Sequence, residues 1–140
     1  MSVCGADIQS RDLVLVSVDK NEDGTFSIVE NACTKIQLAG DDQETVRGFR
    51  RALAGFIRSH DVRRISLKGR NTNGKFAGGA VGFKIEALVQ SLEECDVMIM
   101  MPTTIASQVR RHTLTAPESL YKYQHGAYLT ASATLVKSDK

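Results

Sequence analysis

The stretch from Arg63 to Met101, RRISLKGRNTNGKFAGGAVGFKIEALVQSLEECDVMIMM, decides the fold. Apolar and polar residues alternate over Arg63–Lys68, which predicts a short strand. Apolar residues then recur at intervals of three and four, which predicts a helix from about Gly79 to Glu94. The almost wholly apolar segment Asp96–Met101 predicts a buried strand. Because a strand, a helix and a strand follow in this order, we expect parallel pairing with right-handed crossovers.

The residues before this unit predict an antiparallel meander followed by a helix. Three short runs rich in Val, Ile and Leu are separated by polar turns: Ser2–Gln9, Leu13–Val18 and Thr25–Glu30. Ala32–Leu38 is ambiguous and is interpreted as a continuation of the sheet edge. Gln43–His60 predicts a helix, because its apolar residues fall on one face.

The residues after the unit predict further helical structure. Thr103 or Thr104 is expected to cap a helix that runs to about Arg111. Gly126–Val136 is interpreted as a helix or a strand, since its alanines favour a helix whereas its Thr and Val residues favour a strand. The 140 residues contain no linker and no internal repeat, so residues 1–140 are expected to form one domain.

The composition narrows the class of protein. Hydrophobic residues make up 42% of the chain and charged residues 24%, as in ordinary globular proteins. The three cysteines are isolated and odd in number, which favours a reducing cytoplasm over a disulfide framework. No apolar run approaches the roughly 18 residues of a membrane span, so we expect no membrane contact.

The net charge of +2 conceals an uneven distribution. Met1–Glu44 carries three basic and nine acidic residues, and Ile85–Lys140 carries five basic and six acidic ones. Thr45–Lys84, in contrast, carries ten basic residues and one acid. A basic segment of this kind is typical of a surface for phosphate or nucleic acid, although a solvated helix face offset by acidic neighbours explains it as well.

Several short motifs resemble known families. Val3–Ile8 (VCGADI) and Met101–Ala106 (MPTTIA) resemble the matching pieces of Holliday-junction resolvases. Lys75–Ala80 (KFAGGA) with Phe83–Glu86 (FKIE), and Tyr123–His125 (YQH), resemble a bacterial family of small proteins of unknown function in the ribonuclease H-like superfamily. The resemblance implies an α/β fold of ribonuclease H-like type. Its mixed five-stranded sheet, a three-stranded antiparallel meander plus parallel strands, is expected to be flanked by helices.

The same resemblance supplies a test for catalysis. Nucleases of this fold hold two metal ions, Mg²⁺ or Mn²⁺, with carboxylates. Asp7 stands at the place of the carboxylate on the first strand, but neither Lys68–Arg70 nor Tyr123–Tyr128 supplies the expected further acids. Glu86 is a replacement candidate, so Asp7 and Glu86 are the candidate catalytic residues and Asp7 the candidate metal ligand. The alternatives are a turn-bonding or ion-paired Asp7 and an exposed helical Glu86, and no cofactor is certain.

The basic segment contains a rival motif. Gly69–Lys75 fits G-x-x-x-x-G-K, but Phe76 stands where a P-loop needs Ser or Thr to bind Mg²⁺. A weaker reading remains, in which a glycine-rich loop before a helix receives an anion, or else serves packing in a dimer. The candidate contacts to phosphate or nucleic acid are Arg47, Arg51, Arg58, Lys68, Arg70, Lys75 and Lys84.

The histidines, cysteines, tyrosines and Phe83 give weaker indications of a functional site. The three histidines and three cysteines lack metal-ligand spacing, and the cysteines lie in apolar runs typical of buried, inert thiols. Tyr121 and Tyr123 could stack on bases or pack at the edge of the final segment. Phe83 lies off the apolar face of its helix, which suggests a second buried side or a homodimer contact.

Three functional hypotheses follow. The favoured one is a cytoplasmic, homodimeric protein that binds nucleic acid or another phosphate-containing ligand with little or no catalysis. The second is a metal-dependent nuclease with an altered carboxylate set. The third is a structural or regulatory module that binds other proteins.

Overall fold

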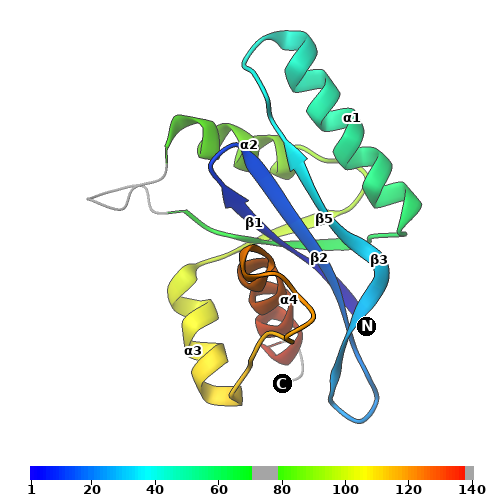
Figure 1. Ribbon diagram of the computed structural model, residues 1–140, viewed down its shortest axis with the longest axis vertical. Helices are drawn as coiled ribbons and strands as arrows, with labels where there is room; N and C mark the ends of the chain where they lie inside the picture. The colour runs from blue at the N-terminus through cyan, green and yellow to red at the C-terminus, as the bar shows by residue number, and fades with distance from the viewer. Residues whose placement is uncertain (71–78, 138–140) are drawn as a thin grey trace.

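A five-stranded mixed sheet forms the centre of the molecule (Figure 1). The computed structural model describes residues 1–70 and 79–137. The order across the sheet is β3-β2-β1-β4-β5; β1 pairs antiparallel with β2 and β2 with β3, whereas β4 pairs parallel with β1 and with β5. The strands are β1 (Ser2–Gln9), β2 (Asp12–Lys20), β3 (Phe26–Gln37), β4 (Arg64–Lys68) and β5 (Asp96–Met100).

Helices cover both faces of this sheet. On one side lie α1 (Gln43–Ser59) and α2 (Ala80–Gln90). On the other lie α3 (Pro102–His112) and α4 (His125–Lys137), the latter preceded by a short 3₁₀ turn, η1 (Lys122–Gln124) (Figure 1). The expected α/β architecture is thereby confirmed, including the meander and the two parallel crossover connections. Within residues 1–70 and 79–137, every helix is too short or too polar to traverse a bilayer.

The two faces of the sheet are packed differently. Under α1 and α2 lies a core of large aliphatic and aromatic side chains, among them Leu13, Phe49, Leu53, Ile65 and Ile85. Under α4 the helix side of the core is made mainly of small residues, and its backbone approaches the sheet closely. A Cβ atom at Gly5 in β1 would overlap the carbonyl oxygen of Ala127, so only glycine permits this approach.

Several boundaries differ from the sequence-based expectation. β3 is one continuous strand over the region predicted in two parts, with an irregularity opposite Val16 and Val18. β5, expected to be buried, is an edge strand with Met98 36% exposed, because an apolar run alone does not distinguish a central strand from an edge. The second helix ends at Gln90 rather than near Glu94.

The start of α3 also differs. Met101 is the N-cap and Pro102 the first helical residue, so neither Thr103 nor Thr104 caps the helix. Proline suits this position because its missing N–H group would have no partner in the first turn. Gly126–Val136, left open between helix and strand, lies within α4.

Candidate functional site

The carboxyl ends of β1 and β4 bring Asp7 and Lys68 together. Ala6 pairs with Leu67 across the two parallel strands, so the next residues, Asp7 and Lys68, are neighbours. Side chains alternate along a strand, and Ser66 in β4 contacts Thr134 of α4. Lys68 therefore lies on the α4 face, as Asp7 does. The two half-buried residues place opposite charges side by side at the carboxyl ends of these inner strands.

Asp7 is held by neighbours that are not cations. Gln9 donates from Nε2 to Asp7 Oδ2 at 3.1 Å and to the Tyr123 carbonyl oxygen at 2.7 Å. Gly126, in the first turn of α4, lies so close that a Cβ atom there would overlap Asp7 Oδ2. Over residues 1–70 and 79–137, no ion pair to Asp7 forms within 4.0 Å. The carboxylate is thus positioned by an amide and a glycine. Gln9 was not among the predicted site residues, although residues two apart on a strand, such as Asp7 and Gln9, share a face.

Arg70, which follows β4, reaches the opposite face of the sheet. Its Nη1 donates to the Ile8 carbonyl oxygen at 3.2 Å. The guanidinium lies against Gly82 of α2, where a Cβ atom would stand 2.5 Å from Cζ. Its Nε is buried without a hydrogen-bond partner. Arg70 therefore bridges β1 and α2 instead of standing beside Asp7.

Glu86 shares this second face. It lies one helical turn after Gly82 on α2, which packs on the face formed by Ala6 and Ile8. Asp7, in contrast, points to α4. The structure therefore does not bring the two candidate catalytic carboxylates to one site. One oxygen of Glu86, Oε2, is buried and has no hydrogen-bond partner.

Three predicted arginines do come together on α1. Arg47, Arg51 and Arg58 line a shallow groove of about 290 Å³ with Arg50, Ala54 and Glu94. Arg51 pairs with Glu44 at 2.8 Å and Arg58 with Glu94 at 3.9 Å, both on the surface. Such exposed pairs are weak, so the groove keeps an excess of positive charge. Arg50, which was not among the predicted contacts, lines the same groove. It stands three residues after Arg47, the spacing of one helix face, which was the available signal.

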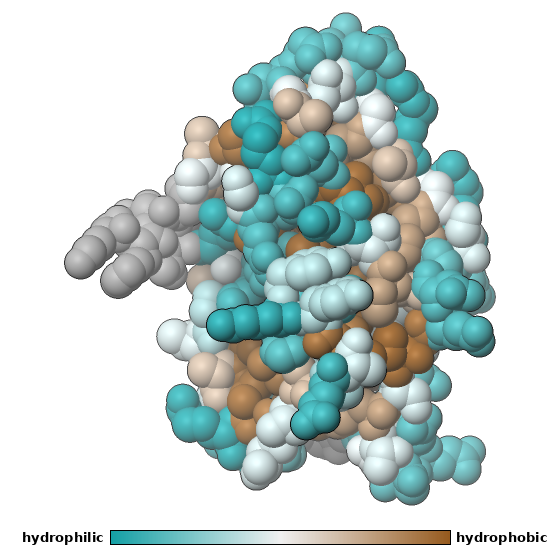
Figure 2. All heavy atoms as spheres, viewed as in Figure 1, coloured by the Kyte–Doolittle hydropathy of each residue, from teal (hydrophilic) through white to brown (hydrophobic). Residues whose placement is uncertain are grey.

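The remaining predicted cations fall elsewhere. Lys84 pairs with Asp41 at 3.6 Å and donates to its carbonyl oxygen at 3.4 Å, which ties α2 to the segment before α1. Lys75 lies outside the described residues, as do most of the G-x-x-x-x-G-K motif and Phe76. Figure 2 shows hydrophilic residues over most of the visible face and hydrophobic ones in small areas between them.

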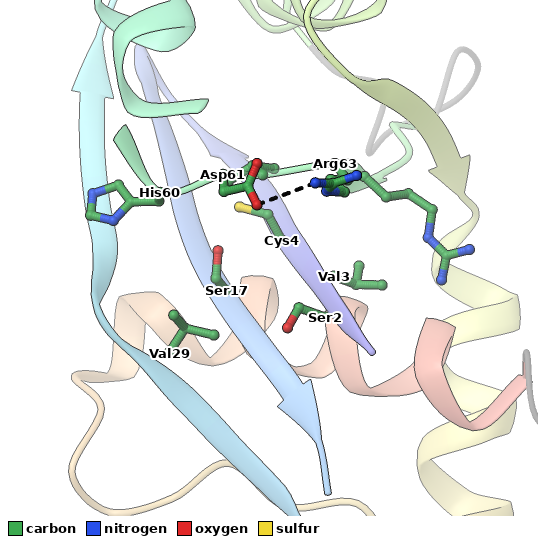
Figure 3. Close-up of a pocket in the computed structure, with 10 residues that line it drawn as sticks. Ser2, Val3, Cys4, Ser17, Val29, His60, Asp61 and Arg63 are labelled. Atoms are coloured by element: carbon green, nitrogen blue, oxygen red, sulfur yellow. Dashed lines mark ion pairs between the residues drawn. The ribbon is translucent and has the colours of Figure 1, made fainter. Parts of the chain in front are cut away.

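A second cavity, of about 340 Å³, opens at the amino ends of β1 and β4 (Figure 3). Cys4 and His60 both line it, but the imidazole lies beside β3 and away from the thiol, and it packs on Phe56 at 4.6 Å between ring centroids. Asp61 pairs with Arg63 at 3.5 Å. Burial raises the pKa of Cys4 to about 12, the opposite of what a thiolate nucleophile requires. The expectation of an inert thiol at Cys4 agrees with this arrangement.

Comparison with known proteins places the chain in a family. Residues 1–134 match the family described as "Protein of unknown function (DUF3010)". The chain belongs to the DUF3010 family. A comparison with curated proteins finds no match to this sequence.

Several solved structures similar to this DUF3010 protein are resolvases. RuvC of Thermus thermophilus superposes with a TM-score of 0.74 at 14% identity, covering 99% of this chain and 95% of that one. The same enzyme in complex with a Holliday junction substrate gives a TM-score of 0.72 at 13% identity over the same shares. The yeast mitochondrial Holliday junction resolvase Ydc2 gives 0.62 at 12% identity, covering 94% and 76%. At these identities the likeness establishes the ribonuclease H-like fold.

The residues at the carboxyl ends do not fit a carboxylate-held pair of metal ions. Asp7 is the one acid there among residues 1–70 and 79–137; Lys68 stands beside it, and Gly126 has no side chain to offer. In the described part of the DUF3010 chain, no three His, Cys, Asp or Glu residues are grouped as metal ligands. A lysine next to the carboxylate supplies a fixed positive charge, which suits an anionic ligand better than a cation.

Proposed function

We propose that this protein binds the phosphate backbone of nucleic acid at the carboxyl ends of β1 and β4, with little or no catalysis. The observation that carries the proposal is Lys68 beside Asp7, at the point where the resolvase resemblance calls for a second carboxylate. A lysine ammonium is a strong partner for phosphate. The Asp7 carboxylate beside it accepts its hydrogen bond from Gln9 and offers none to a phosphate, so Lys68 is the contact. The resolvase bound to its junction substrate supports the choice of ligand class.

The arginine groove on α1 is a second basic surface, on the other side of the sheet from Lys68. Arg47, Arg50, Arg51 and Arg58 can contact phosphates without reading bases, because such contacts position a nucleic acid but carry no direct sequence information. Binding of this kind is sequence-tolerant and weakens as salt rises, since each neutralised phosphate releases counterions. Lys84 is paired with Asp41 and contributes less.

The test is a titration of labelled single strands, duplexes and four-way junctions at two salt concentrations. Wild-type protein is expected to bind at low salt and to lose affinity steeply at high salt. Lys68→Gln is expected to weaken binding to every sequence alike, and Lys84→Gln is the matched control on the other face. Absence of binding at low salt would remove the proposal.

A metal-dependent nuclease is the second candidate function. The observation in its favour is the buried Oε2 of Glu86, which has no hydrogen-bond partner. The same substrates are incubated with Mg²⁺ or Mn²⁺, and wild type is compared with Asp7→Asn and Glu86→Gln. Cleavage abolished by both substitutions would establish the nuclease, and cleavage that neither alters would trace to a contaminant.

Two further parts of the proposal concern assembly. We propose a homodimer in the cytoplasm, supported by the free cysteines and by the edge strand β5 with Met98 and Met101 exposed. Light scattering at several protein concentrations measures the mass and would show a monomer if the proposal is wrong. Co-purification from cells with and without nuclease treatment separates nucleic acid from the third alternative, a module that binds proteins directly.

A further inference from the structure

Two tyrosines form an exposed aromatic surface beside Asp7. Tyr121 is 71% exposed and Tyr123 38%. Their ring planes differ by 6°, and the ring centroids lie 6.0 Å apart. Large aromatic side chains usually contribute to stability through burial, which Tyr121 largely lacks and Tyr123 has only in part. The near-parallel, solvent-facing arrangement, which we call the tyrosine pair, therefore calls for an explanation other than packing.

The tyrosine pair is fixed by hydrogen bonds rather than by burial of its rings. The Tyr121 N–H donates to Gln124 Oε1 at 2.9 Å, and the Gln124 N–H returns a bond to the Tyr121 carbonyl oxygen at 2.9 Å. The Tyr123 carbonyl oxygen accepts from Gln9, the same amide that holds Asp7. These bonds hold the backbone that carries both rings next to the candidate phosphate site, which reduces the entropic cost of ordering that segment when a ligand binds.

One lysine contacts the tyrosine pair, and a second lies further along the same row of the sheet. Lys35 Nζ lies 5.1 Å from the Tyr123 ring centroid, in cation–π contact. In the sheet, Asp7 pairs with Val14 and Val14 with Lys35, so Lys68, Asp7, Val14 and Lys35 follow one line across four strands. Neighbouring strands lie about 4.8 Å apart, which separates Lys68 from Lys35 by about 14 Å. A strand that contacts both lysines must therefore be longer than one nucleotide, since each nucleotide advances about 3.4 Å along a duplex strand.

We propose that the tyrosine pair stacks an unpaired nucleobase of a strand whose phosphates lie along Lys35 and Lys68. The inference rests on the proposed function and names its preferred ligand as nucleic acid with unpaired bases. Bases inside a duplex are stacked on both faces and present no free ring, whereas an unpaired base does. Base–aromatic stacking tolerates any sequence, as the phosphate contacts do. The lysines around the rings favour a polyanion over an apolar peptide.

The experiment measures binding of one oligonucleotide in three forms: single-stranded, fully duplex, and single-stranded with abasic sites. The chain has no Trp and three Tyr, and Tyr128 is 6% exposed and out of reach of a ligand, so a change in tyrosine fluorescence on binding reports chiefly on the tyrosine pair. Wild type is expected to prefer the intact single strand and to lose fluorescence on binding. Tyr121→Leu is expected to weaken single-strand binding about ten-fold, and Tyr121→Phe, the matched control, to retain it.

The outcomes separate this inference from the proposed function. If wild type binds no form at low salt, both fail. If it binds all three forms equally and Tyr121→Leu changes nothing, the stacking inference fails and backbone binding stands. If Tyr121→Phe weakens binding as much as Tyr121→Leu, the hydroxyl and not the ring is responsible, which also overturns stacking. Circular dichroism confirms that each variant is folded.

Discussion

The two faces of the sheet show how one fold separates stability from binding. Beneath α1 and α2, large side chains such as Leu53 and Ile85 hold the helices away from the strands, and the arginines of the α1 groove lie on the outer surface of that helix. Beneath α4, glycine at position 5 brings the helix backbone onto the sheet, and buried hydroxyls pair at 2.6 Å between Ser66 and Thr134. Close packing thus places the start of α4 over Asp7.

That close approach also determines the chemistry of the site. At position 126 a glycine leaves room for Asp7 but supplies no ligand. On the α4 face, the helix backbone lies close to the sheet and few carboxylates are present. On the α1 face, the helix stands further from the sheet and carries many arginines. Mutations on each face determine which of the two contacts the ligand.

The largest effect is expected from Gly5→Ala. The added methyl group would overlap the Ala127 carbonyl oxygen and push α4 off the sheet, at a cost of about 3 kcal/mol in the free energy of unfolding. Urea unfolding measures it. Gly55→Ala on α1 is the control, since a Cβ atom there meets nothing within 4 Å, and a helical Gly→Ala change adds up to about 1 kcal/mol of stability. Equal effects at both positions would contradict the close packing of α4.

The next effect compares one lysine from each face. Lys68→Glu places a second negative charge beside Asp7 and is expected to lower affinity for single-stranded DNA at least ten-fold. Lys84→Glu breaks an exposed pair with Asp41 and is expected to change affinity about two-fold or less. Fluorescence anisotropy at low salt measures both. A greater loss for Lys84→Glu would move the binding site to the α1 and α2 face.

A smaller effect is expected from the arginine groove. Arg47→Gln and Arg50→Gln each remove one phosphate contact, so each should lower the salt slope of binding by about one. Arg110→Gln on α3, away from the groove, is the charge-matched control. An unchanged slope in both groove variants would exclude this surface and leave the α4 face alone.

The sequence patterns predicted the helices and strands better than they predicted which of these elements lie next to one another. Alternation in Arg64–Lys68 already puts Ser66 and Lys68 on one face, and the strand–helix–strand order gives parallel pairing. The composition of β5 could not reveal its edge position, because that depends on which strand pairs next to it. The same holds for Asp7 and Glu86, whose separation by the sheet follows from the face on which α2 packs.

The sequence likewise could not predict which residues come together in the candidate site. A basic segment was visible in the sequence, but its members divide between Lys68 on the α4 face, Arg70 against α2, and the groove on α1. The tyrosine pair could be noticed from spacing alone. Its exposure could not, because exposure depends on where η1 lies against the sheet.

The smallest effect at neutral pH concerns the cysteines of the two faces. Cys4 is buried under α1, and burial raises its pKa to about 12. Cys33, on the α4 face, and Cys95 are half-buried. Burial raises the pKa of both thiols, that of Cys95 to about 11. A thiol reagent at pH 8 is expected to modify Cys33 and Cys95 slowly, faster as pH rises, and Cys4 only after unfolding. Cys4→Ala should react with the same two-thiol stoichiometry. Three equally fast thiols in the folded protein would show that the α1 face opens as readily as the α4 face, contrary to the packing of its large side chains.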